Sequence, residues 1–214
     1  MPHKLPGVLA PRKTPVQARS TVTVDAIFEA TIQVLLIHGA DRLTTTRVAE
    51  RAGVSVGTLY QYYPNKQSLL FAVLENHLDR VALALEEACK QSHGKPLADM
   101  VQAIVEHFVD AKMERTDISI ALYRIAAELG GATLVKQMGD RSRKALKATL
   151  RTAPDAHFPQ EDFAVQMMLS AMAGTTRSVL EAGASAVMVR RLREHLVLLC
   201  QSYAAAIATR GEQT

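Results

Sequence analysis

The fold of this chain is decided by residues 43–70, which read Leu43-Thr-Thr-Thr-Arg-Val-Ala-Glu-Arg-Ala-Gly-Val-Ser-Val-Gly-Thr-Leu-Tyr-Gln-Tyr-Tyr-Pro-Asn-Lys-Gln-Ser-Leu-Leu70. The threonines at 44–46 offer hydroxyl N-caps to a short helix, and Gly53 permits a left-handed turn after it. Ser55 can cap a second short helix, which must end before Pro64 because proline disfavours helical geometry in the preceding residue. Residues suited to the buried side are Ala49, Val54 and Leu59. Two short helices about a tight turn are typical of a helix-turn-helix.

The outward side of the second short helix is polar, aromatic and free of carboxylates. Its residues are Val56, Gly57, Thr58, Tyr60, Gln61 and Tyr62. A helix that enters the major groove of DNA needs such a surface, since phosphate repels acidic side chains. Gly57 would let the helix approach the DNA backbone closely. The amide of Gln61 can pair with adenine, whereas Val56 offers only apolar contact to a thymine methyl. The pattern predicts a recognition helix.

Residues 25–75 resemble the DNA-binding signature of the TetR family of transcriptional regulators. The resemblance rests on Ala52-Gly-Val-Ser-Val-Gly-Thr-Leu-Tyr-Gln-Tyr62 with a following Lys66 and Leu69. It implies Thr45 and Thr58 at phosphates, Tyr62 and Lys66 at the backbone, and Val56, Gly57, Tyr60 and Gln61 nearest to bases. Ser55 completes the expected DNA-binding set. Tyr63-Pro64-Asn65 departs from the usual Phe, variable residue and Ser of the family, but Asn65 can still cap the next helix.

Composition predicts an all-α protein. Of the 214 residues 48% are hydrophobic, tryptophan is absent, and long stretches lack glycine and proline. We expect about nine helices, arranged as an N-terminal three-helix helix-turn-helix domain and a C-terminal helical bundle. The expected divisions are a flexible basic arm over 1–20, a DNA-binding domain over 21–66, and a ligand-sensing and dimerisation domain over 67–214. Predicted later helices cover about 97–111, 117–129, 132–152, 161–182 and 186–209.

The positive charge is concentrated at the N-terminal end. Residues 1–66 contain eight Lys and Arg against four acids, so the remainder has 25 − 8 = 17 basic and 21 − 4 = 17 acidic residues. The net charge of +4 therefore lies wholly in the first third, which suits a polyanion partner such as DNA. An ordinary solvated surface would account for the same excess. Arg47 and Arg51 could contact phosphate or remain in solvent.

A recognition helix contacts few base pairs, so specific binding calls for a homodimer on a palindromic double-stranded operator. The last two helices offer an apolar seam and small residues for close packing. The expected interface residues are Ala171, Gly174, Thr175, Leu192, Leu196, Leu199 and Tyr203. The resemblance implies a four-helix dimer interface from these two helices. The alternative is that the seam belongs only to the intramolecular core.

The middle helices mix methionines and aromatic rings with a few polar groups, which suits a cavity for a small, largely apolar effector. The candidate residues are Met100, Ile104, His107, Phe108, Tyr123, Phe163 and Met167. A closed helical core would use the same residues. The basic run over 141–151 could bind an anion or form a solvated face. By resemblance, an effector would release DNA by favouring a dimer whose recognition helices no longer match the groove spacing.

We therefore expect a regulator and not an enzyme. The resemblance favours a ligand-responsive repressor, although an activator would use the same DNA-contacting residues. The alternative is a DNA-binding regulator without a small-molecule effector, controlled by a protein partner or by oxidation of Cys89 or Cys200. No GxSxG motif, P-loop or metal-spaced cluster is present, the histidines are scattered, and no cofactor is implied. The longest aliphatic run, residues 34–37, is short for a membrane span, so the sequence predicts a cytoplasmic protein without a membrane partner.

Overall fold

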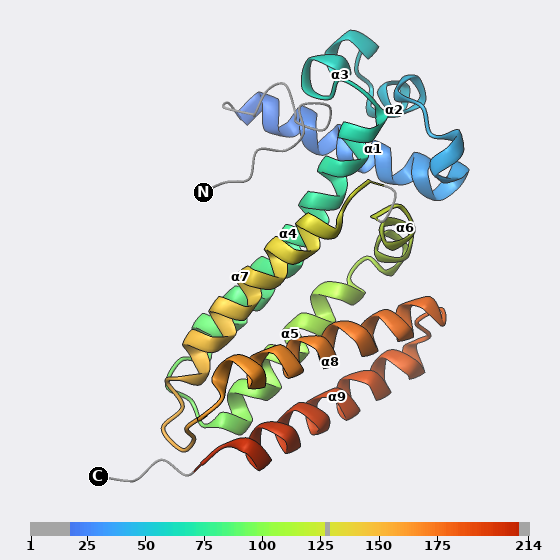
Figure 1. Cartoon of the computed structure of the whole chain (residues 1–214). Helices are drawn as coiled ribbons and strands as arrows, with labels where there is room; N and C mark the ends of the chain where they lie inside the picture. The colour runs from blue at the N-terminus through green and yellow to red at the C-terminus, as the bar shows by residue number, and fades with distance from the viewer. Residues whose placement is uncertain (1–17, 127–128, 210–214) are drawn as a thin grey trace. The chain divides into compact units, whose positions relative to one another are not determined.

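The structure, a computed structural model, describes residues 18–126 and 129–209 (Figure 1). These residues form nine α-helices and contain no β-strand, which confirms the all-α prediction. The helices are α1 Ala18–Arg42, α2 Thr45–Ala52, α3 Val56–Tyr62, α4 Lys66–Gln91, α5 Leu97–Met113, α6 Thr116–Ala126, α7 Ala132–Leu150, α8 Glu161–Glu181 and α9 Ala186–Ile207. Of the arm expected over 1–20, residues 1–17 lie outside the described part, and Ala18 already begins α1.

The chain divides into two compact units. Unit 1 holds the described residues up to His77 together with those from Ile120 to Ala132, and unit 2 holds Leu78–Ser119 and the described residues from Thr133 onward. The first turns of α4 thus belong with α1, α2 and α3, whereas the division expected from the sequence ended the N-terminal domain at residue 66.

The core of unit 1 is built on one face of α1. Val24, Ile27, Ala30 and Val34 are buried and recur at helical spacing, so α1 turns one apolar stripe inward. At Gly39 the backbone leaves helical geometry with φ 75° and ψ 169°, which a residue with a side chain rarely adopts. The regular helix therefore ends at Gly39.

The start of α4 is fixed by a capping box. The Asn65 side-chain oxygen accepts from the Ser68 amide at 2.7 Å, and the Ser68 hydroxyl accepts from the Asn65 amide at 3.3 Å. These reciprocal bonds satisfy two backbone donors that a helix N-terminus otherwise leaves open. Asn65 thus performs the capping role expected of it.

The core of unit 2 is formed mainly by α5, α8 and α9, which pack against one another. Its buried residues include Ile104 and Phe108 of α5, Met168 and Met172 of α8, and Leu196 of α9. Close-packed aliphatic side chains of this kind provide most of the stabilisation of a helical bundle.

An arginine of α7 pairs with two carboxylates of α4. Arg141 donates from Nε to Glu86 at 2.9 Å and also forms an ion pair with Asp79. The bonds to Glu86 and then to Asp79 hold the pKa of Arg141 above its ordinary value. This part of the basic run therefore links α7 to α4 and is not an open basic face.

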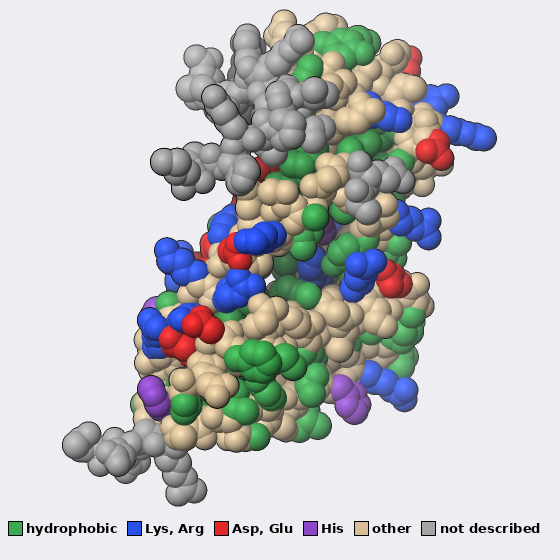
Figure 2. All heavy atoms as spheres, in the orientation of Figure 1, with side chains coloured by type: hydrophobic (Ala, Val, Ile, Leu, Met, Phe, Trp, Pro, Cys, Tyr) green, Lys and Arg blue, Asp and Glu red, His purple; other side chains and the backbone are tan. Residues whose placement is uncertain are grey.

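The end of α7 pairs with the start of α8. Glu161 is bonded to Arg151 and, at 2.9 Å, to Lys147, and these bonds lower the pKa of Glu161 to about 2. Lys147 also reaches Asp162 at 2.7 Å. Figure 2 shows basic and acidic side chains gathered together where α7 ends and α8 begins. Ion pairs with the start of α8 thus engage Lys147 and Arg151, two residues of the basic run over 141–151.

A short antiparallel bridge joins the α7–α8 connection to the residues after α9. The His157 amide donates to the Thr209 carbonyl, and the Thr209 amide donates to the His157 carbonyl, both at 2.9 Å. Beside it lies a pocket of about 480 Å³ whose lining includes Arg151, Phe158 and Glu161. The bridge thus fastens two segments that are 52 residues apart in sequence.

Candidate nucleic-acid interface

The turn between α2 and α3 has the geometry that the sequence predicted. Thr44 caps α2 by accepting from the Arg47 amide, and Gly53 follows α2 in the left-handed region with φ 68° and ψ 27°. The Val54 amide donates to the Ala49 carbonyl at 3.0 Å, which closes the turn over the last residues of α2. The short loop therefore fixes the direction in which α3 leaves α2.

One buried side chain anchors α3 to unit 1. Leu59 is fully buried, as are Val48 and Ala49 of α2, so these apolar residues hold the two helices together. The opposite side of α3 faces outward: Gly57, Tyr60 and Gln61 are exposed, and Val56, Thr58 and Tyr62 are half-buried. The six outward residues predicted from the sequence thus share an accessible surface without a carboxylate.

Two hydroxyl pairs lie at this surface. The Ser55 hydroxyl accepts from the Thr58 amide at 2.9 Å and lies 2.8 Å from the Thr58 hydroxyl. The Thr45 hydroxyl lies 3.0 Å from the Tyr60 hydroxyl. Four of the predicted DNA-binding residues therefore interact with one another, the first pair as the N-cap of α3 and the second between α2 and α3.

Adjacent tyrosines at the end of α3 have different environments. Tyr63 is buried, its ring centroid lies 5.8 Å from that of Phe28, and burial raises the pKa of its hydroxyl. Tyr62 is half-buried, with its ring centroid 6.4 Å from that of Tyr63. Tyr63 therefore serves as a core aromatic residue, which explains why it can replace the usual phenylalanine, while Tyr62 stays accessible.

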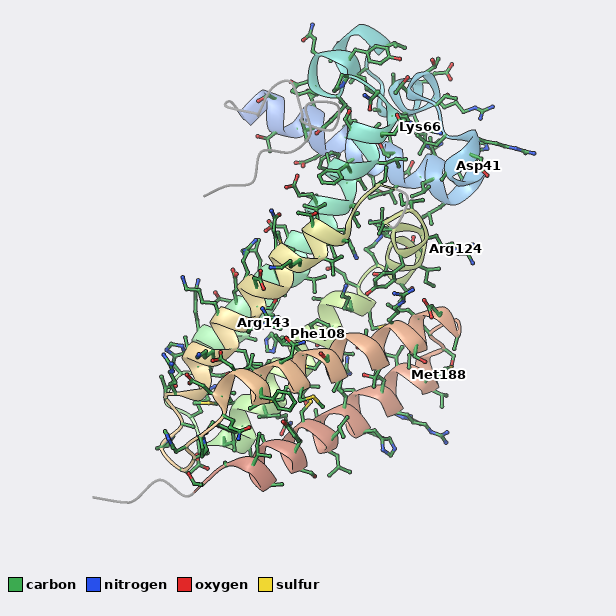
Figure 3. The ribbon with its side chains drawn as sticks, viewed as in Figure 1. Asp41, Lys66, Phe108, Arg124, Arg143 and Met188 are labelled. Atoms are coloured by element: carbon green, nitrogen blue, oxygen red, sulfur yellow. The ribbon has the colours of Figure 1, made fainter. Side chains whose placement is uncertain are left out.

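Cations hold the end of α1 in place. The Lys66 ammonium donates to the Ala40 carbonyl at 3.1 Å, and Figure 3 labels Lys66 at the start of α4. Arg47 donates to the Arg42 carbonyl at 2.6 Å, and Arg51 donates to the Gln33 side chain at 2.6 Å. The two arginines left undecided from the sequence thus bind α1 through backbone and side-chain oxygens. Only the fold reveals these contacts.

The predicted dimer seam divides between core and surface. Leu192 and Leu196 are buried in the unit 2 core, and Tyr203 packs against that core. Leu199 is 49% exposed, and Gly174 is also exposed. Ala171 and Thr175 are half-buried and joined by a hydrogen bond of 2.6 Å from the Thr175 hydroxyl to the Ala171 carbonyl.

Leu198 of α9 is 60% exposed and was not among the residues expected at the seam. The leucine spacing used for that prediction traces mostly the buried face of the helix. A search for a second apolar face of α9 would have found it.

The predicted ligand residues do not gather in one place. Met100, Ile104 and Phe108 are buried on α5, where Figure 3 labels Phe108. His107 is exposed and lies 2.7 Å from the Ala103 carbonyl through its Nδ1. The remaining three are Tyr123, half-buried in unit 1, and Phe163 and Met167, which are 62% and 44% exposed on α8.

The described residues include no metal cluster and one long apolar helical stretch. Over residues 18–126 and 129–209, no group of three or more His, Cys, Asp or Glu side chains could hold a metal ion. One stretch, Ser20–Arg42, is long and apolar enough to cross a membrane by length and composition alone. Part of this stretch, including Ile27 and Val34, is buried in the core of unit 1, as is usual for a core helix.

Parts of the chain match two related families. Residues 27–73 match the bacterial regulatory proteins of the tetR family, and residues 96–203, half of the chain, match the tetracyclin repressor-like C-terminal domain. The HTH-type transcriptional repressor KstR of Rhodococcus jostii is 30% identical over 115 residues, which are 53% of this chain and 52% of KstR. The nucleoid occlusion factor SlmA of Haemophilus influenzae is 29% identical over 105 residues, which are 46% of this chain and 48% of SlmA. The chain thus spans about half the length of these relatives.

Solved structures share the fold. A TetR-family regulator from Mesorhizobium loti superposes with a TM-score of 0.75 at 15% identity, covering 90% of this chain and all of that one. The fatty acid degradation regulator FadR of Bacillus halodurans gives a TM-score of 0.69 at 17% identity, covering 88% of this chain and 96% of FadR. The family matches confirm the prediction of a regulator and not an enzyme. This chain belongs to the TetR family of bacterial transcriptional regulators.

Proposed function

We propose that this protein is a transcriptional repressor that binds a palindromic operator as a homodimer and releases it when a small, largely apolar ligand binds the C-terminal domain. The observation that supports DNA binding most directly is the outward surface of α3. It is free of carboxylates, it includes an exposed glycine and an exposed glutamine, and buried Leu59 fixes it to α2. Such a surface suits the major groove, where phosphates line both edges. We place this activity in the cytoplasm.

The test is a binding titration with DNA from upstream of the protein's own gene and with duplexes that the protein selects from a random library. It compares wild type with Tyr62→Ala at about 50 and about 200 mM salt, where phosphate contacts differ strongly in strength. We expect selective binding by wild type that weakens steeply with salt and is lost in the variant. Leu83→Ala, a change at an exposed residue of α4, is the control and should bind like wild type. Non-selective binding by wild type to both kinds of DNA would contradict the proposal.

The dimer that we propose uses exposed residues of α8 and α9. Phe163, Met167 and Gly174 are spaced by four and seven residues, so they share one face of α8, and all three are exposed. Leu198 and Leu199 are exposed on α9, and hydrophobic side chains reach the visible surface over both helices (Figure 2). Aromatic residues and methionine are enriched at protein interfaces. We therefore assign Phe163 and Met167 to pairing and no longer to ligand binding.

Leu199→Asp tests this interface by placing a charge in it. We expect the variant to sediment as a monomer in analytical ultracentrifugation and to lose operator binding, because one recognition helix gives too few contacts. Leu83→Asp is a matched control, since Leu83 is also 49% exposed but lies on α4. A dimeric Leu199→Asp protein would exclude this face as the interface.

Two observations support an apolar ligand: the apolar core of unit 2 and the names of two similar proteins. The fatty acid metabolism regulator protein of Bacillus subtilis is 28% identical over 65 residues, which are 30% of this chain and 34% of that protein, and FadR is a fatty acid degradation regulator. Met100, Ile104 and Phe108 lie side by side along the buried face of α5 and would contact an apolar molecule that enters this core.

A long-chain fatty acid and the corresponding alcohol are suitable probes. We expect one of them to weaken operator binding and to raise the melting temperature, since a ligand that binds only the folded state stabilises it. The alternative of control by cysteine oxidation is disfavoured, because burial raises the pKa of both Cys89 and Cys200 to about 11. Release of DNA by mild oxidant, together with no effect of either probe, would favour that alternative.

A further inference from the structure

A pair of hydroxyl groups, those of Thr45 and Tyr60, joins α2 to α3. Thr45 is the first residue of α2 and Tyr60 lies on α3, and their hydroxyl oxygens are 3.0 Å apart. The Thr45 side chain is half-buried and Tyr60 is 40% exposed, so the pair lies at the accessible surface of unit 1. This side-chain bond ties α3 to the start of α2.

The two hydroxyl groups have two protons between them, and this limits the hydrogen bonds that the pair can donate to other groups. Each hydroxyl has one proton and can also accept, so a bonded pair uses one proton internally and keeps one for an outside acceptor. A phenol is the stronger acid and hence the better donor, which favours donation from Tyr60 to Thr45. The Thr45 proton then remains available, while that of Tyr60 is already engaged.

We propose that Tyr60 is a positioning residue that holds the Thr45 hydroxyl toward a phosphate of the DNA backbone and does not read a base. A phosphate oxygen only accepts hydrogen bonds, so it needs the free proton of Thr45. Donation from Tyr60 polarises the Thr45 hydroxyl and strengthens its own donation. This inference rests on the proposed function, and it replaces the expectation that Tyr60 lies among the residues nearest to bases.

The second hydroxyl pair has a different role. The Ser55 hydroxyl accepts from the Thr58 amide as an N-cap and lies 2.8 Å from the Thr58 hydroxyl, so its contacts hold the first turn of α3. The pair of Thr45 and Tyr60 joins two helices and caps neither of them. It can therefore transmit the position of α3 to the contact that α2 makes with the backbone.

A double-mutant cycle tests the proposal with a duplex that the wild-type dimer has selected from a random library. Thr45→Val and Tyr60→Phe should each weaken binding by about tenfold, the value expected for one hydrogen bond to a charged group. Because both changes break the same chain of hydrogen bonds, the double variant should also lose about tenfold and not about a hundredfold. Thr45→Ser, which keeps the hydroxyl, should bind like wild type.

Tyr62→Phe is the matched control, since it removes the same atom from the same helix. Its effect should multiply with that of Thr45→Val. Single base-pair substitutions in the duplex distinguish positioning from base reading: Tyr60→Phe should keep the wild-type order of preference at every position, whereas the loss of a base contact would change the order at one position. Multiplicative losses in the Thr45 and Tyr60 cycle, or an altered preference at one base pair, would overturn the proposal.

The outcomes for this proposal and for the proposed function are distinct. If wild type binds DNA selectively but the losses of Thr45→Val and Tyr60→Phe multiply, only the proposed role of Tyr60 is overturned. Absence of selective wild-type binding overturns DNA recognition itself and the role of Tyr60 with it. Circular dichroism melting of each variant accompanies the titrations, and we expect little change because both side chains lie at the surface.

Discussion

The substitution Gly57→Ala should change the free energy of unfolding and the affinity for DNA in opposite directions. Gly57 is exposed in the first turn of α3, and a methyl group built there would have the Ser55 side-chain oxygen as its nearest neighbour, at 3.7 Å. That distance is an ordinary contact, so nothing within the protein excludes alanine. Alanine is the better helix former, and we expect the free energy of unfolding to rise by about 0.5 kcal/mol at this position near the helix end.

The effect on DNA binding should have the opposite sign. If Gly57 lies where α3 comes closest to the DNA backbone, an added methyl group moves the helix outward and costs about 1–3 kcal/mol, the usual penalty for overpacking a fitted contact. This penalty corresponds to a loss of affinity of about fivefold to about a hundredfold. Fluorescence anisotropy with a selected duplex measures the loss, and urea unfolding followed by circular dichroism measures the stability.

Gly53→Ala provides the contrast. Gly53 has φ 68°, a conformation in which alanine is strained, so this change should lower the free energy of unfolding by about 1 kcal/mol or more. The reasoning about Gly57 would be refuted by wild-type affinity in Gly57→Ala, since its missing side chain would then serve neither the fold nor the DNA.

Three further predictions concern burial and ionisation. Leu59→Ala should lower the free energy of unfolding by about 2–5 kcal/mol and abolish operator binding, because Leu59 is fully buried on the inner side of α3; urea titration and anisotropy would check both effects. Cys89 and Cys200, each with a pKa raised to about 11, should react with a thiol reagent at pH 8 far more slowly in native than in urea-unfolded protein, as absorbance would record. Glu161 has a pKa lowered to about 2, so the stability that it contributes is present above its ordinary pKa near 4.5 and is lost as the pH falls toward 2. Glu161→Gln should therefore flatten the dependence of the melting temperature on pH in that interval, and an equal slope in both proteins would contradict the assignment.

The parts of the structure that could be predicted from the sequence depend on short-range contacts. Thr44, Gly53 and Ser55 act within three or four residues of their own positions, so the caps and the turn can be read from spacing alone. The same holds for Asn65, whose capping partner Ser68 is three residues away. The helix-turn-helix was predictable because contacts within one short segment of sequence determine its geometry.

The remaining features depend on contacts between distant residues. Arg141 pairs with Glu86, 55 residues away, and spacing along α7 contains no information about that partner. Phe163 and Met167 resembled cavity residues because an apolar side chain has the same identity on either face of a helix. Only the packing of α8 against α5 and α9 determines which face is buried. Helical periodicity thus predicts a stripe of residues but not the neighbour that covers it.

Hydrogen exchange at the amides of His157 and Thr209 should reveal local opening of the bridge between them. Each amide donates to the carbonyl of the other residue, so neither proton can exchange with solvent until the bridge itself opens. Although both residues lie outside the helices, their amide protons should show a common protection factor that is higher than those of neighbouring loop residues. Native-state hydrogen exchange at these two amides would therefore report directly how often the residues after α9 detach from the α7–α8 connection.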